Sequence, residues 1–141
     1  MQTGNVLIDD DGSVKLADFD GSFELIHLKD SPRTNFGSPI YVAPEVAKHV
    51  DRLSQDADVW GIGCIVLEMA TGTPPWCDEY DDRAEVIHRL KQGTDSPSIS
   101  STVDPTTESF IRQCLDPNPR ERPSLEQLQN HEFLKQRPRL N

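Results

Sequence analysis

The sequence contains few cysteines and no long uncharged hydrophobic run. Its three cysteines (Cys64, Cys77 and Cys114) are odd in number and form no Cys-X-X-Cys pair, which favours reduced thiols over a disulfide framework. The longest apolar stretch, residues 59–70, is interrupted by Glu68 and is shorter than a membrane-spanning helix requires. No charged-then-apolar signal peptide opens the chain. We therefore expect no membrane association and a cytoplasmic, or else nuclear, location.

Basic residues are also scarce. Lys and Arg number 14 against 24 Asp and Glu, which gives a net charge of −10. A charge of this sign repels phosphate backbones and anionic lipid surfaces, so neither nucleic acid nor membrane is an expected partner. The four histidines do not pair with cysteines at zinc-ligand spacing. The length of 141 residues and the hydrophobic share of 35% suit one domain with one core.

The first part of the chain predicts a β-hairpin followed by a long loop. Residues 6–8 and 14–16 are short apolar runs, and the acidic, glycine-containing segment 9–12 joins them. We interpret Asp9, Asp10 and Asp11 as a solvated turn, because the acid and glycine order of a calcium loop is missing. Two strands make no stable sheet by themselves, so we expect the hairpin to lie against helices. Residues 17–43 have no sustained periodicity, which is typical of a functional loop.

The rest of the chain predicts helices. Apolar residues occupy most of the circumference of the segment 55–70, which indicates a buried central helix beginning after Ser54. Ser124 and Gln127 have the spacing of a capping box, and Gly93 is a helix stop. The expected helices cover residues 44–48, 54–70, 83–92, 105–115 and 124–134. The predicted fold class is therefore mainly α with one short hairpin at the N-terminus.

Six short motifs occur in a fixed order along the chain. They are Asn-Val-Leu-Ile at 5–8, Asp-Phe-Asp at 18–20, Gly-Ser-Pro-Ile-Tyr-Val-Ala-Pro-Glu at 37–45, Asp-Val-Trp-Gly-Ile-Gly-Cys at 58–64, Thr-Gly-Thr-Pro-Pro-Trp at 71–76 and Cys-Leu-Asp-Pro-Asn-Pro-Arg-Glu-Arg-Pro-Ser at 114–124. Any one of them is a weak signal, but their order is specific. Over essentially its whole length the chain resembles the C-terminal lobe of the eukaryotic protein kinase family. Its details are most similar to the kinase kinase kinase and sterile-20-like branch.

The resemblance implies a serine/threonine protein kinase that uses ATP and Mg²⁺ and has a protein substrate. Asn5 matches the asparagine that ends the catalytic loop and ligates Mg²⁺. Asp18 matches the aspartate of the DFG motif, which bridges Mg²⁺ and the nucleotide phosphates. Residues 1–17 would be the end of the catalytic loop and the hairpin, residues 18–45 the activation segment, and residues 46–141 the helical subdomain.

The same resemblance assigns roles within the activation segment. Phe19 would pack inward and set the active or inactive state of the loop. Asp20 stands where the motif has glycine, which adds a side chain and a negative charge beside the metal ligand. Thr34 is the expected regulatory phosphosite, and Ser38 the hydroxyl near the catalytic aspartate. The Gly-Ser-Pro order favours a serine or threonine acceptor.

Three further residues are expected to be structural. Glu45 resembles the glutamate of the Ala-Pro-Glu motif, and Arg122 resembles the arginine that pairs with it in a bidentate contact. Asp58 resembles the carboxylate that accepts backbone N–H groups of the catalytic loop. Trp60 and Trp76 are expected to pack in the core, and the three cysteines are interpreted as inert buried thiols.

The sequence departs from the family pattern in ways that affect activity. The catalytic aspartate would lie five residues before Asn5, which is before Met1. The glycine-rich loop, phosphate-pairing lysine and helix glutamate of the N-terminal lobe are likewise not among these residues. Gln2 stands where Ser/Thr kinases carry a lysine that contacts the transferred phosphate, and an amide lacks that charge. We therefore expect the isolated chain to be inactive and to need the missing N-lobe.

Three alternatives remain open at this point. Gln2 and Asp20 also suit a pseudokinase or a non-catalytic helical binding module. Asp18-Phe19-Asp20 is also an Asp-X-Asp pattern, as found at metal sites of glycosyltransferases, although the Ala-Pro-Glu at 43–45 argues for the kinase interpretation. The acidic stretch 78–85 is either a solvated face or a surface that favours basic substrates.

Overall fold

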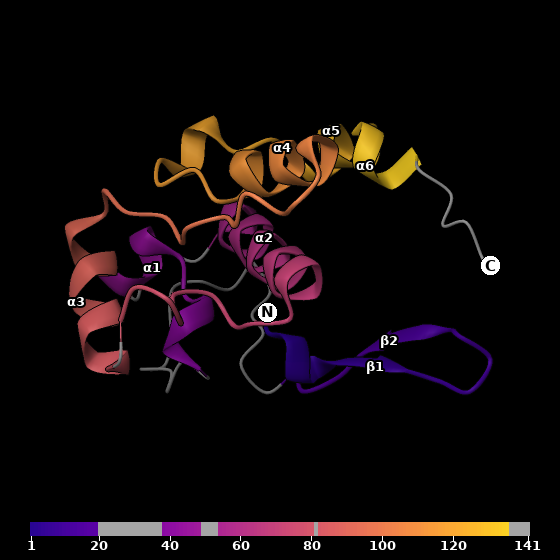
Figure 1. Ribbon diagram of the computed structural model, residues 1–141, viewed down its shortest axis with the longest axis horizontal. Helices are drawn as coiled ribbons and strands as arrows, with labels where there is room; N and C mark the ends of the chain where they lie inside the picture. Colours follow the sequence, from indigo (N-terminus) through magenta and orange to yellow (C-terminus); the bar gives the residue numbers. More distant parts are fainter. Residues whose placement is uncertain (20–37, 49–53, 81, 136–141) are drawn as a thin grey trace.

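The structure is a computed structural model that describes residues 1–19, 38–48, 54–80 and 82–135 (Figure 1). A two-stranded antiparallel hairpin precedes a set of helices, which confirms the predicted mainly α fold class. The elements in chain order are η1 (Thr3–Asn5), β1 (Val6–Ile8), β2 (Val14–Leu16), η3 (Pro39–Tyr41), α1 (Pro44–Lys48), α2 (Gln55–Thr71), α3 (Arg83–Gln92), α4 (Pro105–Cys114), η4 (Pro119–Glu121), α5 (Leu125–Gln129) and α6 (Glu132–Lys135).

Helix α2 is the centre of the fold. Eight of its residues are buried, and Trp60 and Cys64 are fully so, as expected of a helix that is apolar on most sides. Figure 1 shows α4, α5 and α6 along one side of α2, with α1 and α3 together at one end of the molecule. Within the described residues, no helix has the length and apolar character needed to cross a membrane.

Helix α4 approaches α2 closely at a glycine. A Cβ atom added to Gly63 would lie 2.7 Å from Cys114 Cβ and 2.8 Å from Leu115 Cδ2. The missing side chain therefore allows the two helices to pack in direct contact. Phe110 and Ile111 of α4 are fully or almost fully buried at the same core.

Most predicted helix ends agree with the structure because their capping partners are local. Asp104 accepts hydrogen bonds from the backbone N–H groups of Thr106 and Thr107. The capping box of Ser124 and Gln127 is present, with distances of 3.2 and 2.7 Å. Gly93 ends α3 with a φ of 71°, in the left-handed region that favours glycine.

Two predicted helix features differ from the structure. Ser54 occupies the N-cap position of α2, but its hydroxyl donates to Asp56 Oδ2 (3.2 Å) and caps no backbone N–H. The helix expected over 124–134 is divided into α5 and α6. His131 causes the break, because its Nδ1 accepts the N–H of Phe133 at 3.1 Å and so caps the start of a new helix.

The predicted hairpin is present, with Val6 opposite Leu16 and Ile8 opposite Val14. Its turn is solvated as predicted, and Lys15 forms an exposed ion pair with Asp9 (2.7 Å). The expectation that its strands lie against the helices is wrong, however. Ile8 is 74% exposed and Val14 64% exposed, and Figure 1 shows the hairpin projecting from the helices. Within the described residues no second layer covers it.

Candidate active site

Asn5 closes the short turn η1 at the base of the hairpin. Its backbone N–H donates to Gln2 O at 3.1 Å. Its side-chain Oδ1 accepts a hydrogen bond from Gln2 Nε2 at 3.2 Å. The side chain is half-buried, so the Gln2 contact holds the amide oxygen in one orientation.

The hairpin brings Asp18 to the same end as Asn5. The N–H of Ala17 donates to Asn5 O at 2.9 Å, which extends the ladder one pair beyond Val6 and Leu16. Asp18 is the next residue, and its φ of 59° is in the left-handed region, where a non-glycine residue is uncommon and where a chain turns sharply. Asp18 is exposed.

The residues present fit a magnesium ion. An amide oxygen and a carboxylate are hard donors of the kind that Mg²⁺ prefers, and Mg²⁺ in nucleotide sites keeps waters and phosphates as its other ligands. Among the described residues no group of three or more His, Cys, Asp or Glu side chains is arranged to hold a metal. A two-residue site completed by nucleotide and water is consistent with that finding. That Asn5 and Asp18 share one ion stays a prediction.

Of the predicted activation segment, residues 18–45, the structure describes residues 18–19 and 38–45. Phe19 is 63% exposed, so the inward packing expected of it is not found, because no described apolar element covers the hairpin face beside it. Asp20 and Thr34 lie outside the described residues. Ser38 is half-buried at the N-cap position of η3, and its N–H donates to Gln2 Oε1 at 3.4 Å.

A cluster of three oxygen atoms links η1, η3 and α2, and sequence reasoning missed it. The hydroxyl of Tyr41 donates to Glu68 Oε2 at 2.5 Å, and the hydroxyl of Thr3 donates to the same atom. Thr3 Oγ1 and Tyr41 Oη are 3.0 Å apart. Burial, reinforced by the hydrogen bond to Glu68, raises the pKa of Tyr41 to about 12. The available signal was Glu68 itself, a carboxylate inside an otherwise apolar helix.

Arg122 is the buried partner of Glu45. Its Nη1 and Nη2 donate to Glu45 Oε1 and Oε2, each at 2.8 Å. The Arg122 side chain is fully buried, and it also donates to the backbone oxygens of Asp56 and Asp116 at 2.8 Å. Its guanidinium carbon lies 5.0 Å from the centre of the Trp60 ring. These contacts fasten the start of α1, where the predicted activation segment (residues 18–45) ends, to the helical core.

The contact expected of Asp58 with the catalytic loop stays a prediction. Its side chain is exposed and accepts no hydrogen bond from the described part of the chain. The catalytic-loop amides that it was expected to bind are those around the family's aspartate, which would precede Met1. One turn further along α2, a Cβ on Gly61 would lie 3.0 Å from Met1 Cβ, so this part of α2 does face the N-terminal residues.

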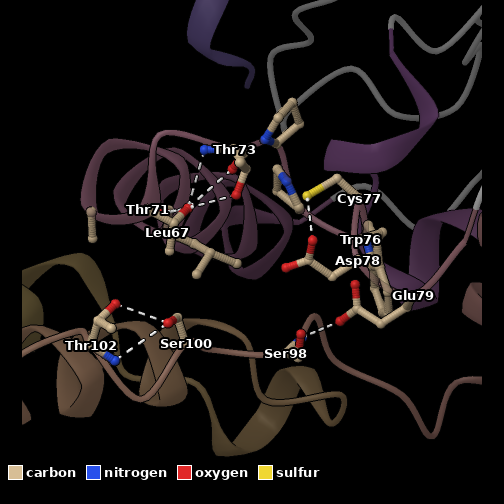
Figure 2. Close-up of a pocket in the computed structure, with 13 residues that line it drawn as sticks. Leu67, Thr71, Thr73, Trp76, Cys77, Asp78, Glu79, Ser98, Ser100 and Thr102 are labelled. Atoms are coloured by element: carbon tan, nitrogen blue, oxygen red, sulfur yellow. Dashed lines mark hydrogen bonds between the residues drawn. The ribbon is translucent and has the colours of Figure 1, made fainter.

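A polar cavity of about 270 Å³ lies elsewhere, between the end of α2, residues 73–79 and residues 98–102. Figure 2 shows Asp78 and Glu79 on one side and Ser98, Ser100 and Thr102 on the other, with Glu79 accepting the N–H of Ser98. None of the predicted site residues lines it. Cys77 at this cavity is exposed, so the interpretation of all three cysteines as buried is wrong for Cys77.

Comparisons with known proteins identify the family of the chain. A family model described as protein kinase domain matches residues 1–134. Mitogen-activated protein kinase kinase kinase 3 of Arabidopsis thaliana is 36% identical over 136 residues, which are 95% of this chain and 21% of that protein. Mitogen-activated protein kinase kinase kinase YODA of Arabidopsis thaliana is 37% identical, covering 96% of this chain and 15% of that protein.

A relative from a different organism shows the same relationship. Mitogen-activated protein kinase kinase kinase A of Dictyostelium discoideum is 34% identical over 134 residues, or 95% of this chain and 14% of that protein. The chain thus spans about a fifth or less of the length of these relatives. Their names confirm the predicted resemblance to the kinase kinase kinase branch. The chain belongs to the protein kinase domain family.

Proposed function

We propose that this chain is the C-terminal lobe of a serine/threonine kinase domain whose complete protein phosphorylates a protein substrate with ATP and Mg²⁺. The observation that carries the proposal is the backbone bond between Ala17 and Asn5, which places Asn5 and Asp18 at the same end of the hairpin. The family match along residues 1–134 supports it.

The roles of the residues follow from their chemistry. Asn5 Oδ1 and the Asp18 carboxylate would hold Mg²⁺, which, when bound, neutralises charge on the phosphates during transfer. The backbone of Asp18 is left-handed, with a φ of 59°, so the chain turns sharply directly after the strand ladder. The Glu45–Arg122 pair anchors the end of the activation segment, where an acceptor hydroxyl would be positioned.

These residues are insufficient for turnover by themselves. Phosphoryl transfer depends on positioning and electrostatics supplied from both lobes and on a base near the acceptor hydroxyl, and the chain contains neither the glycine-rich loop nor the His-Arg-Asp triplet. We propose that the N-lobe covers the exposed apolar side chains of the hairpin, which include Leu7, Ile8, Val14 and Leu16. Residues 1–141 expressed alone are expected to associate through this surface and to show no kinase activity.

The test compares the full-length protein with its Asp18→Asn variant. Transfer of labelled phosphate from ATP to protein is expected in the unsubstituted protein and is expected to disappear in Asp18→Asn. Asp10→Asn, in the exposed hairpin turn, is the matched control and should retain activity. Equal activity of unsubstituted and Asp18→Asn proteins would contradict the proposal, as would activity of residues 1–141 alone.

A non-catalytic binding module is the second candidate function. Gln2 favours it, because a neutral amide stands where the resemblance implies a phosphate-contacting lysine. A full-length protein that folds but shows neither Mg²⁺-dependent nucleotide binding nor phosphate transfer would establish this second function instead.

A further inference from the structure

Gln2 connects two parts of the candidate active site. Its Nε2 donates to Asn5 Oδ1 at 3.2 Å, and its Oε1 accepts the N–H of Ser38 at 3.4 Å. Asn5 is the predicted metal ligand. Ser38, which is 36 positions from Gln2, lies near the C-terminal end of the activation segment. A single amide group therefore bridges the metal-binding turn and the substrate-side loop.

In this series of hydrogen bonds, each group determines which atom of the next side-chain amide must face it. The backbone N–H of Ser38 can only donate, so Gln2 must present its oxygen to Ser38 and its NH₂ group to Asn5. The NH₂ group can only donate in turn, so Asn5 must present Oδ1 and not Nδ2 to Gln2. One backbone N–H thus determines the orientation of both side-chain amides.

The orientation of Asn5 matters because only its oxygen can bind a cation. Oδ1 has two lone pairs; the contact with Gln2 uses one and leaves the other for a metal. Mutating a residue that orients a metal ligand through a hydrogen bond typically lowers the metal affinity or the activity about 10–100-fold. Resting on the function proposed above, we propose that Gln2 is a positioning residue that holds Asn5 Oδ1 ready for Mg²⁺ and couples it to Ser38.

The proposal requires both ends of the Gln2 side chain. A lysine at this position could donate to Asn5 Oδ1 but could not accept from Ser38, because an ammonium group has no acceptor. A methionine has no donor for Asn5 Oδ1 and offers only a weak sulfur acceptor to Ser38. Gln2→Lys and Gln2→Met therefore separate the donor role from the acceptor role.

The experiment uses the full-length protein with two readouts that do not depend on catalytic turnover. The first is the Mg²⁺ concentration needed for half-maximal enhancement of the binding of a fluorescent ATP analogue. The second is the amide hydrogen exchange rate at Ser38. Gln2→Met should raise the required Mg²⁺ concentration about tenfold and speed exchange at Ser38 about fivefold, as expected for the loss of one hydrogen bond. Gln2→Lys should also speed exchange at Ser38, but it should raise the Mg²⁺ requirement less than Gln2→Met does, because its ammonium group can still donate to Asn5 Oδ1.

A change at Asn5 separates the orientation of the Asn5 side chain from a general structural effect of Gln2→Met. In the Asn5→Asp variant both terminal atoms are oxygens, so rotation of the group no longer removes the ligand. Adding Gln2→Met to Asn5→Asp should therefore leave its Mg²⁺ requirement unchanged. Gln129→Met, at an exposed position of α5, is the matched control and should change neither readout.

Several outcomes would overturn the proposal. Gln2→Met with an unchanged Mg²⁺ requirement would show that Gln2 does not position Asn5. A Mg²⁺ requirement raised by Gln2→Lys as much as by Gln2→Met would show a general structural effect and no positioning of Asn5. The same increase when Gln2→Met is added to Asn5→Asp would show this as well. Absence of Mg²⁺-dependent nucleotide binding in the unsubstituted protein would overturn the proposed kinase function together with this inference. Binding in that protein with no effect of Gln2→Met would overturn this inference alone.

Discussion

Glu45 and Arg122 are 77 positions apart in the sequence and form two parallel hydrogen bonds of 2.8 Å each. The Arg122 side chain is fully buried, whereas Glu45 retains 13% exposure. The positive charge is therefore withdrawn from water and depends on this carboxylate and on two backbone oxygens for compensation.

Breaking this pair should destabilise the domain strongly. Glu45→Gln leaves the buried Arg122 charge without its counter-ion, and the expected loss in the free energy of unfolding is about 3–5 kcal/mol. Urea unfolding of the complete kinase domain measures it. The exposed pair of Arg112 and Glu108 provides the control, since Glu108→Gln should cost at most about 1 kcal/mol. Similar losses for the two variants would contradict the burial argument.

The contact between α2 and α4 predicts the effect of a single methyl group. Gly63→Ala places a Cβ within 2.9 Å of Cys114 and Leu115 atoms, and overpacking of this kind costs about 1–3 kcal/mol. Thermal unfolding should show a lower melting temperature. Gly4→Ala is the matched control, because a Cβ there meets nothing within 4 Å. A melting temperature for Gly63→Ala no lower than that of Gly4→Ala would disprove the close packing.

The raised pKa of Tyr41 predicts a loss of stability in alkali. Its pKa is about 12 in the folded protein against 10.0 for an ordinary tyrosine. Its contribution to stability is therefore fully present below pH 10 and falls as the pH rises from 10 to about 12, because only the unfolded state ionises there. The difference in unfolding free energy between unsubstituted protein and Tyr41→Phe should shrink over this range. A constant difference would contradict the raised pKa.

The cysteines should differ in reactivity. Burial raises the pKa of the Cys64 thiol and raises that of Cys114 to about 12, so both are protonated and shielded at neutral pH. Cys77 is exposed. Iodoacetamide applied to the native protein should modify Cys77 first, as read by peptide mass spectrometry, and the other two only after denaturation. Early modification of Cys64 would show that α2 is less protected than its packing implies.

Local sequence was sufficient to predict elements whose stabilising partners are near in the chain. The caps at Asp104 and Ser124 accept hydrogen bonds from N–H groups two or three residues away. Gly93 adopts a left-handed conformation because glycine has no Cβ atom to oppose a positive φ. The expected apolar burial of α2 was similarly visible as a run of apolar residues. The break between α5 and α6 at His131 could not be predicted in this way, because the capping acceptor is a ring nitrogen and not the more usual side-chain oxygen.

What the sequence by itself determined is therefore the family, the two hairpin strands, most of the helices and the pairing of Glu45 with Arg122. The roles of Asn5 and Asp18 as magnesium ligands stay predictions. Only the tertiary structure decided that Gln2 bridges Asn5 and Ser38 and that Thr3 and Tyr41 meet on Glu68. It also decided that Phe19 and the hairpin strands are exposed. The reason is physical: a hydrogen bond or a buried surface between segments 27 to 65 positions apart depends on how helices pack, and no local pattern encodes it.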